Sequence, residues 1–181
     1  MCFYWYTVYV LVKMKLHPRI TEQDNQQERL VSDDYLAGFV EGEGCFYIGI
    51  VRSHETNSKW QVVYFFKVSQ NPTGRLVLEE LRKRLACGYI KANSRLDKSD
   101  KSLAYVVRDL PNLVSKVIPF FKGKLLTKKA EDFEKFCYVI DLVSTRQHLS
   151  KQGMAKILDI AYTMNTAKRR FSKQEILENF D

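Results

Sequence analysis

Two glutamates, Glu41 and Glu43, stand at the C-terminal end of a short helix that we predict over residues 34–42. Negative charge at this end opposes the helix dipole and costs about 0.3–1 kcal/mol. No basic residue in the same turn offsets that cost. A bound divalent cation would account for the acids, because it takes carboxylate oxygens as ligands. The alternative is a solvated acidic helix exit, which is the commoner explanation for an isolated Glu-Gly-Glu-Gly run.

Small residues on the same helix favour a close helix–helix contact. Gly38 and Gly42 are four positions apart and share one helix face. This spacing lets two helix backbones approach closely. If the helix packs against a copy of itself, two Glu43 carboxylates come side by side, and a metal ion must neutralise them for both to ionise. The pattern predicts metal-assisted phosphodiester hydrolysis by a homodimer, with an interface formed by Leu36, Ala37, Gly38, Val40, Glu41 and Gly42.

The composition limits the partners. The chain has 181 residues, with 29 Lys and Arg against 21 Asp and Glu, a net charge of +8. This excess favours a polyanion, either nucleic acid or an anionic membrane surface. Four cysteines without C-x-x-C spacing and three scattered histidines argue against structural zinc. The apolar first twelve residues are too few to span a membrane as a helix, and no membrane partner is expected.

The periodicity of apolar residues indicates how these residues are positioned. We expect a poorly ordered N-terminal extension over 1–31 and one domain over 32–181. Helices are predicted to start near 34, 75, 111 and 128, and the one from Pro111 directs Leu113, Val114 and Phe121 inward. Thr127 is a predicted cap for the helix that starts at 128. Ser150 and Ser172 begin two closing helices, and Ser172 with Glu175 forms a capping box. Alternating patterns predict strands over 45–51, 60–70, 89–94 and 103–108. The order αββαββα, with extra C-terminal helices, predicts an α+β domain with helices on one face of an antiparallel sheet.

The segment 36–44, LAGFVEGEG, resembles the LAGLIDADG motif position by position. Glu41 and Glu43 replace its aspartates, and Gly42 replaces its alanine. Further likeness extends over roughly 33–165, in the runs 66–70, 85–88, 119–121, 125–129, 132–133, 148–150 and 164–165. The motif occurs once, as in the single-motif, homodimeric LAGLIDADG homing endonucleases. The resemblance implies a half-domain with a saddle-shaped sheet.

The resemblance also implies site residues. Glu43 matches the acid that binds the catalytic metal, Mg²⁺ or another divalent cation, at the dimer seam. Glu41 matches the other acid and resembles a helix-end structural contact. Gln70 falls where the family places a polar residue that orders active-site water.

Three basic residues are candidates for the remaining catalytic positions. Arg75 is a candidate for a basic group near the site. Lys128 or Lys129 corresponds to the active-site lysine, with Lys128 preferred, which could stabilise developing negative charge. For all three, the alternative is a solvated surface charge.

In the family one face of the sheet lies along the DNA major groove. Strand alternation places on that face Cys45, Tyr47, Gly49, Val51, Ser53, Gln61, Val63, Phe65, Lys67, Lys91, Asn93, Ala104, Val106 and Arg108. The predicted DNA-binding residues among them are Tyr47, Ser53, Gln61, Lys67, Lys91, Asn93 and Arg108. The face is more apolar than is expected for a protein that recognises a DNA sequence with high specificity.

These observations predict an intron-encoded, site-specific DNA endonuclease that cuts both strands of a long near-palindromic site as a homodimer. The alternatives are a relative that holds intron RNA as a maturase without cutting, and an inactive relative. We expect an intracellular location, in an organelle (mitochondrion or chloroplast) or a bacterial cytoplasm.

Overall fold

The computed structural model describes residues 31–94, 97, 99–164 and 170–180. Except for residue 31, the expected N-terminal extension lies outside these residues and stays a prediction. Residues 33–181 form one compact unit. In the part of the chain that the structure describes, no helix is both long and apolar enough to cross a membrane.

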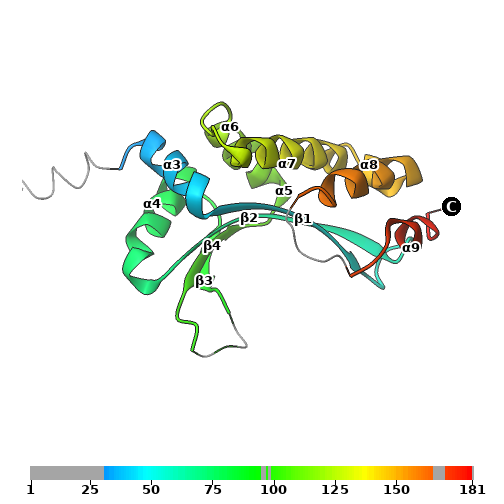
Figure 1. Cartoon of the computed structure of the whole chain (residues 1–181), viewed down its shortest axis with the longest axis horizontal. Helices are drawn as coiled ribbons and strands as arrows, with labels where there is room; N and C mark the ends of the chain where they lie inside the picture. Colours follow the sequence, from blue (N-terminus) through cyan, green and yellow to red (C-terminus); the bar gives the residue numbers. More distant parts are fainter. Residues whose placement is uncertain (1–30, 95–96, 98, 165–169, 181) are drawn as a thin grey trace, which may run out of the picture. The chain divides into compact units, whose positions relative to one another are not determined.

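Four antiparallel strands form one sheet in the order β1-β2-β4-β3. The main helices lie on one side of it, with α7 against β1, α8 packed on α7, and α4 against β4 (Figure 1). The predicted α+β class and element order are therefore confirmed. The strands are β1 (Gly44–Arg52), β2 (Trp60–Gln70), β3 (Tyr89–Ala92) and β4 (Leu103–Val107), and the longer helices are α3 (Asp33–Glu43), α4 (Arg75–Leu85), α7 (Lys128–Ser144) and α8 (Lys151–Ala161). The shorter elements are η1 (Pro72–Gly74), α5 (Leu110–Asn112), η2 (Leu113–Val117), α6 (Ile118–Phe121), η3 (Gln147–Leu149) and α9 (Lys173–Leu177).

The core lies between the sheet and the helices. Phe46 of β1 pairs with Phe66 of β2, and both side chains face the helix layer. The Phe46 ring lies 5.0 to 5.7 Å, between centroids, from the rings of Phe66, Phe121, Phe133 and Phe136. Each such ring contributes about 1.5–3 kcal/mol on burial. This aromatic cluster fixes α6 and α7 over β1 and so positions the start of β1.

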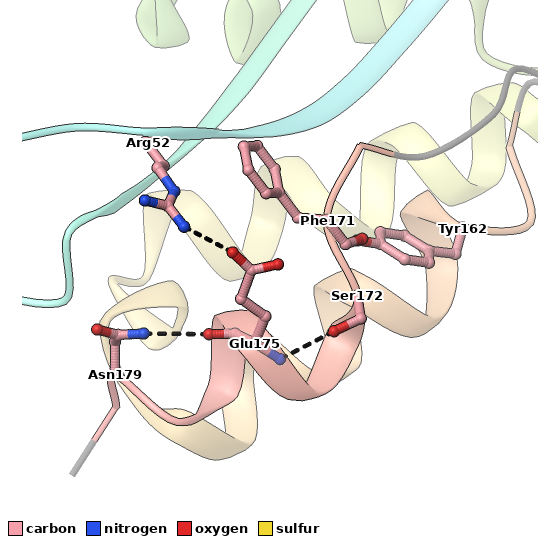
Figure 2. A network of polar contacts seen from close by, with 6 residues as sticks. All are labelled: Arg52, Tyr162, Phe171, Ser172, Glu175 and Asn179. Atoms are coloured by element: carbon pink, nitrogen blue, oxygen red, sulfur yellow. Dashed lines mark hydrogen bonds and ion pairs between the residues drawn. The ribbon is translucent and has the colours of Figure 1, made fainter.

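Three predicted helix caps are present. The hydroxyl oxygens of Thr127, Ser150 and Ser172 accept backbone N–H bonds at the starts of α7, α8 and α9. The predicted capping box at Ser172 is only half formed, because the Glu175 carboxylate accepts from Arg52 of β1 instead (Figure 2).

The helical segment that begins at Leu110 differs from the expectation. Residues Leu113–Val117 form a π-helical turn, which is wider than an α-helical one. Leu113, Val117 and Phe121 point inward with a spacing of four, whereas Val114 is 45% exposed. The predicted inward position of Val114 is wrong because the sequence pattern was read with the α-helical period.

Candidate active site

The end of α3 joins β1 without a loop. α3 ends at Glu43 and β1 begins at Gly44. A Cβ atom on Gly44 would lie 2.5 Å from Cγ1 and 2.6 Å from the carbonyl oxygen of Val40. A side chain does not fit there, so the chain can turn from helix into strand only with glycine at this position. The Glu43 side chain is exposed, and none of the described residues hydrogen-bonds or ion-pairs with its carboxylate. The junction therefore presents a free carboxylate on a rigid support.

Glu41, two residues earlier, is fully engaged. Its carboxylate accepts hydrogen bonds from the backbone N–H groups of Leu126 at 2.9 Å and Thr127 at 2.7 Å. These groups precede the first turn of α7, where a negative charge is favourable. The backbone hydrogen bond from Thr127 is the main cause that lowers the pKa of Glu41. Glu41 therefore ties α3 to α7, which agrees with the helix-end contact that the resemblance implied.

Of the two candidate lysines, Lys129 lies at the junction. Its ammonium group donates to the carbonyl oxygen of Gly44. Lys128 is exposed and makes no hydrogen bond or ion pair with the described residues. The first turn of α7 thus directs the second lysine of the pair, and not the first, toward β1.

Cys45 and Asp132 also belong to this neighbourhood, and sequence reasoning gave neither a role. Burial raises the pKa of the Cys45 thiol, and the positive charge of Lys129 opposes that rise more than Lys67 does. The nearby Asp132 charge adds to the rise. The Oδ1 atom of Asp132 is buried, and no described residue bonds to it. The sequence signal that could have identified Asp132 is the run 132–133, which belongs to the likeness to the family and lies one helix turn after Lys129.

Gln70 ends β2 at the same end of the sheet as Glu43. Gly44 pairs with Val68, so Gln70 lies beside the junction between α3 and β1. Its Oε1 atom accepts from the backbone N–H of Asn71 at 3.2 Å. Arg75 begins α4 and pairs with Glu79 at 2.7 Å along the same helix. The structure thus brings Gln70 and Lys129 to the Glu43 end of the sheet, while Arg75 is engaged on α4.

The predicted dimer interface divides into two sets. Leu36, Ala37 and Val40 are at most 2% exposed and pack in the protein's own core. Their side chains face the interior of this chain and not its surface. Gly38 and Gly42 lie on the exposed face, where an added Cβ would meet no described atom within 4 Å. The sequence could not separate the faces because both carry small residues.

The sheet face away from the helices carries the side chains that alternation placed there. Tyr47 pairs with Phe65 and Lys67 pairs with Val106, so these residues share one face. The Tyr47 and Phe65 rings stack 4.6 Å apart, and the Arg108 guanidinium lies 5.3 Å from the Phe65 centroid.

Other members of this face differ in accessibility. Gln61 is exposed, and Lys67 and Lys91 are half-buried. The Ser53 hydroxyl accepts from the backbone N–H of Glu55 in the turn after β1. The Asn93 side-chain oxygen accepts from the Ser69 hydroxyl of β2. Ala104 and Val106 also belong to this face but are buried, so they are not available to contact a ligand.

The oxygen donors of the junction suit a hard cation but do not complete a site. Within the described residues, no cluster of three or more His, Cys, Asp or Glu side chains could hold a metal ion. Glu43 supplies one free carboxylate at this end of the sheet. Among the described residues, a cation at this junction would therefore have one free carboxylate ligand, that of Glu43.

Comparisons with known proteins identify the family. The LAGLIDADG endonuclease family matches residues 36–140, more than half of the chain. The chain belongs to the LAGLIDADG endonuclease family. The probable intron-encoded endonuclease 2 of Neurospora crassa is 30% identical over 128 residues, which cover 70% of this chain and 26% of that protein. The chain spans about a quarter to a third of the length of the first curated relatives that it matches.

Solved structures agree. The homing endonuclease I-TnaI is 35% identical, with a TM-score of 0.70, and the match covers 82% of this chain and 95% of that one. The I-LtrWI LAGLIDADG homing endonuclease bound to target DNA is 30% identical, with a TM-score of 0.70. That match covers 76% of this chain and 45% of I-LtrWI.

Proposed function

We propose that this protein is a site-specific DNA endonuclease that cuts both strands of a near-palindromic duplex as a homodimer, with Mg²⁺ or another divalent cation. The observation that carries the proposal is the free Glu43 carboxylate, held at the rigid end of α3 beside Lys129. The similarity to I-LtrWI, which was solved bound to target DNA, supports duplex DNA as the substrate.

The exposed glycines of α3 support a homodimer. A glycine inside a helix costs about 1 kcal/mol relative to alanine. Gly38 and Gly42 both carry that cost, although an alanine at either position would contact no described atom. A second α3 packed against this face would require the small residues. The match to almost all of I-TnaI but less than half of I-LtrWI is consistent with one motif per chain.

The roles of the junction residues follow from their chemistry. Glu43 from each chain would hold a divalent cation, which polarises a phosphodiester oxygen and lowers the pKa of bound water. Lys129 places a positive charge beside the junction, where it would stabilise negative charge developing on the phosphate. Gln70 would orient the attacking water from the end of β2. Arg75 is the weaker candidate, since Glu79 already engages it.

The open sheet face would bind the DNA. Gln61, Lys67, Lys91 and Arg108 carry side chains that can hydrogen-bond base edges or phosphates. Tyr47 and Phe65 form a stacked pair between the polar positions, so they would contribute shape and apolar contact. Because several relatives are described as intron-encoded, we place the protein in the compartment of an intron-bearing organellar or bacterial genome.

The test uses the full chain and a library of randomised, symmetric duplexes. With Mg²⁺ we expect double-strand cuts at one near-palindromic site. Chelation of the metal should abolish cutting, and added Mg²⁺ should restore it. Tight binding of a structured intron RNA without cleavage would replace this proposal with the maturase function. A protein that neither cuts DNA nor binds RNA would overturn both the endonuclease and the maturase function.

A further inference from the structure

The end of the β1–β2 pair far from Glu43 extends beyond the rest of the sheet. β4 pairs with β2 only over residues 66–70, whereas β1 pairs with β2 along its whole length. Residues 47–52 and 60–65 therefore form a two-stranded ribbon, which we call the distal ribbon. A two-stranded ribbon is only marginally stable by itself and twists readily. Its tip needs another support to keep a defined position.

The C-terminal segment 171–180 supplies that support. The Arg52 guanidinium lies 2.6 Å from the Glu175 carboxylate and 5.3 Å from the ring centroids of both Trp60 and Phe171. The Trp60 and Phe171 rings meet edge to face at 4.9 Å. Trp60 is only 4% exposed as a result of this packing. Figure 2 shows Arg52 reaching from the strand toward Glu175, with Phe171 beside it.

The same segment is attached to the helix layer. The Tyr162 hydroxyl, just after α8, donates to the carbonyl oxygen of Phe171 at 2.6 Å. Lys173 pairs with Asp159 of α8 at 2.5 Å. Ile176 and Phe180 are buried. The segment is thus bonded to α8 on one side and to the ribbon tip on the other, and α9 lies at that end of the sheet (Figure 1).

The ion pair between Arg52 and Glu175 is a weak source of global stability. Its side chains are 63% and 40% exposed, and exposed ion pairs contribute little to stability. Its geometric effect is larger, because it joins residues 123 positions apart and holds the end of β1. The open face of the same ribbon carries Gln61 and Ser53. At about 3.3 Å per residue, the ribbon tip lies roughly 25–30 Å from Glu43, or about eight base pairs along a duplex.

We propose that Arg52 and Glu175 are positioning residues for DNA specificity, which set how the distal ribbon reads the outer base pairs of each half-site. This inference rests on the proposed endonuclease function. It assigns to segment 171–180 the task of holding the ribbon at a fixed angle to the DNA. Loss of the pair should relax reading at the outer positions and leave the centre of the site, near Glu43, unchanged.

The experiment compares the full-length wild type with Glu175→Gln. Glu178→Gln is the matched control, since this residue is exposed on the same short segment and its carboxylate accepts a hydrogen bond only from Gln174 among the described residues. Cleavage is measured on the target and on every single-base-pair variant of one half-site. We expect Glu175→Gln to lose about 2–5-fold in discrimination at the outermost two or three pairs, which is the range that one exposed ion pair can supply. Discrimination at inner pairs and cutting of the target should stay within about twofold, because the inner pairs lie near Glu43 and not at the ribbon tip.

A second measurement does not depend on cleavage. Amide hydrogen exchange of DNA-free Glu175→Gln should be faster over 50–61 and unchanged over 44–48. The reversed pair, Arg52→Glu with Glu175→Arg, should restore slow exchange and outer discrimination. If exchange is faster in Glu175→Gln but the wild type does not cut DNA, the support of the ribbon by segment 171–180 stands and the endonuclease function is overturned. Unchanged exchange, or equal loss of discrimination at all positions, would overturn the positioning role.

Discussion

The two ends of the β1–β2 pair differ in whether their charged side chains form ion pairs. At the distal end, Arg52 pairs with Glu175, and Lys173 of the same segment pairs with Asp159. At the α3 end, Glu43 is exposed and unpaired among the described residues, although Lys129 lies at the next residue's carbonyl group. Paired charges at the tip serve the architecture. The unpaired acid, fixed on a helix end, is available to a ligand.

The same contrast recurs inside the motif. Glu41 and Glu43 are two residues apart, yet both carboxylate oxygens of Glu41 accept hydrogen bonds from backbone N–H groups at the start of α7. Two chemically identical side chains therefore have different roles, because only one of them faces backbone N–H groups. Four substitutions would break or sharpen this comparison.

The largest effect is expected for Glu43→Gln. Removal of the free carboxylate should lower cleavage at least about a hundredfold, the scale seen when one preorganised electrostatic group is lost from an active site. Binding of the duplex should change little, because the sheet face is untouched. Cleavage and binding titrations of the same duplex measure the two effects. Glu41→Gln is the matched control and should still cut. Wild-type cutting by Glu43→Gln would place the chemistry elsewhere.

The two lysines of α7 form the second pair. Lys129→Met should lower the single-turnover rate by about 10–100-fold, because a positive charge beside the junction is lost. Lys128→Met, which removes the same charge from an exposed position one residue earlier, should change the rate less than about twofold. Equal losses in both variants would mean that the effect is general attraction to DNA and not a role at the junction.

Gly38→Ala should separate folding from dimerisation. Alanine would stabilise α3 of the isolated chain by up to about 1 kcal/mol, since its Cβ meets no described atom. The same Cβ should keep two α3 helices apart and raise the dimer dissociation constant about tenfold or more. Sedimentation measures the association, and denaturant unfolding of dilute protein measures the stability. Glu134→Ala, on the exposed side of α7, is the control and should leave association unchanged. Tighter dimers in Gly38→Ala would exclude this face from the seam.

The smallest effect concerns acid stability. The pKa of Glu41 is lowered by the backbone hydrogen bond from Thr127, so its contribution to folding is complete above the ordinary value of 4.5 and is lost as the pH falls below it. Glu41→Gln should lower the unfolding free energy at pH 7 by about 1 kcal/mol. The difference from wild type should shrink between about pH 5 and pH 3, as urea unfolding at several pH values would show. A difference that is constant with pH would contradict a role for the charge.

Much of the fold follows from local patterns. Alternation over 45–53 and 61–67 assigned each strand side chain to the correct face, because successive residues of any strand point in opposite directions. The helix caps at Thr127, Ser150 and Ser172 were identified because a cap involves residues two or three positions apart. The motif 36–44 is also a local pattern, and it was sufficient to locate the junction between α3 and β1 and to single out Glu43.

Other features depended on contacts between distant segments. Glu41 meets Leu126 and Thr127 only because α6 and α7 pack over β1 through the aromatic cluster around Phe46. That packing also selects Lys129 over Lys128 and buries Leu36, Ala37 and Val40 in the core. The Glu175 carboxylate was predicted to complete a capping box, but it accepts instead from Arg52, 123 residues away in the sequence. The sequence by itself therefore determined the elements, the faces of the strands and the acidic junction. The tertiary structure alone decided which charge meets which partner, because those distances depend on how whole elements pack.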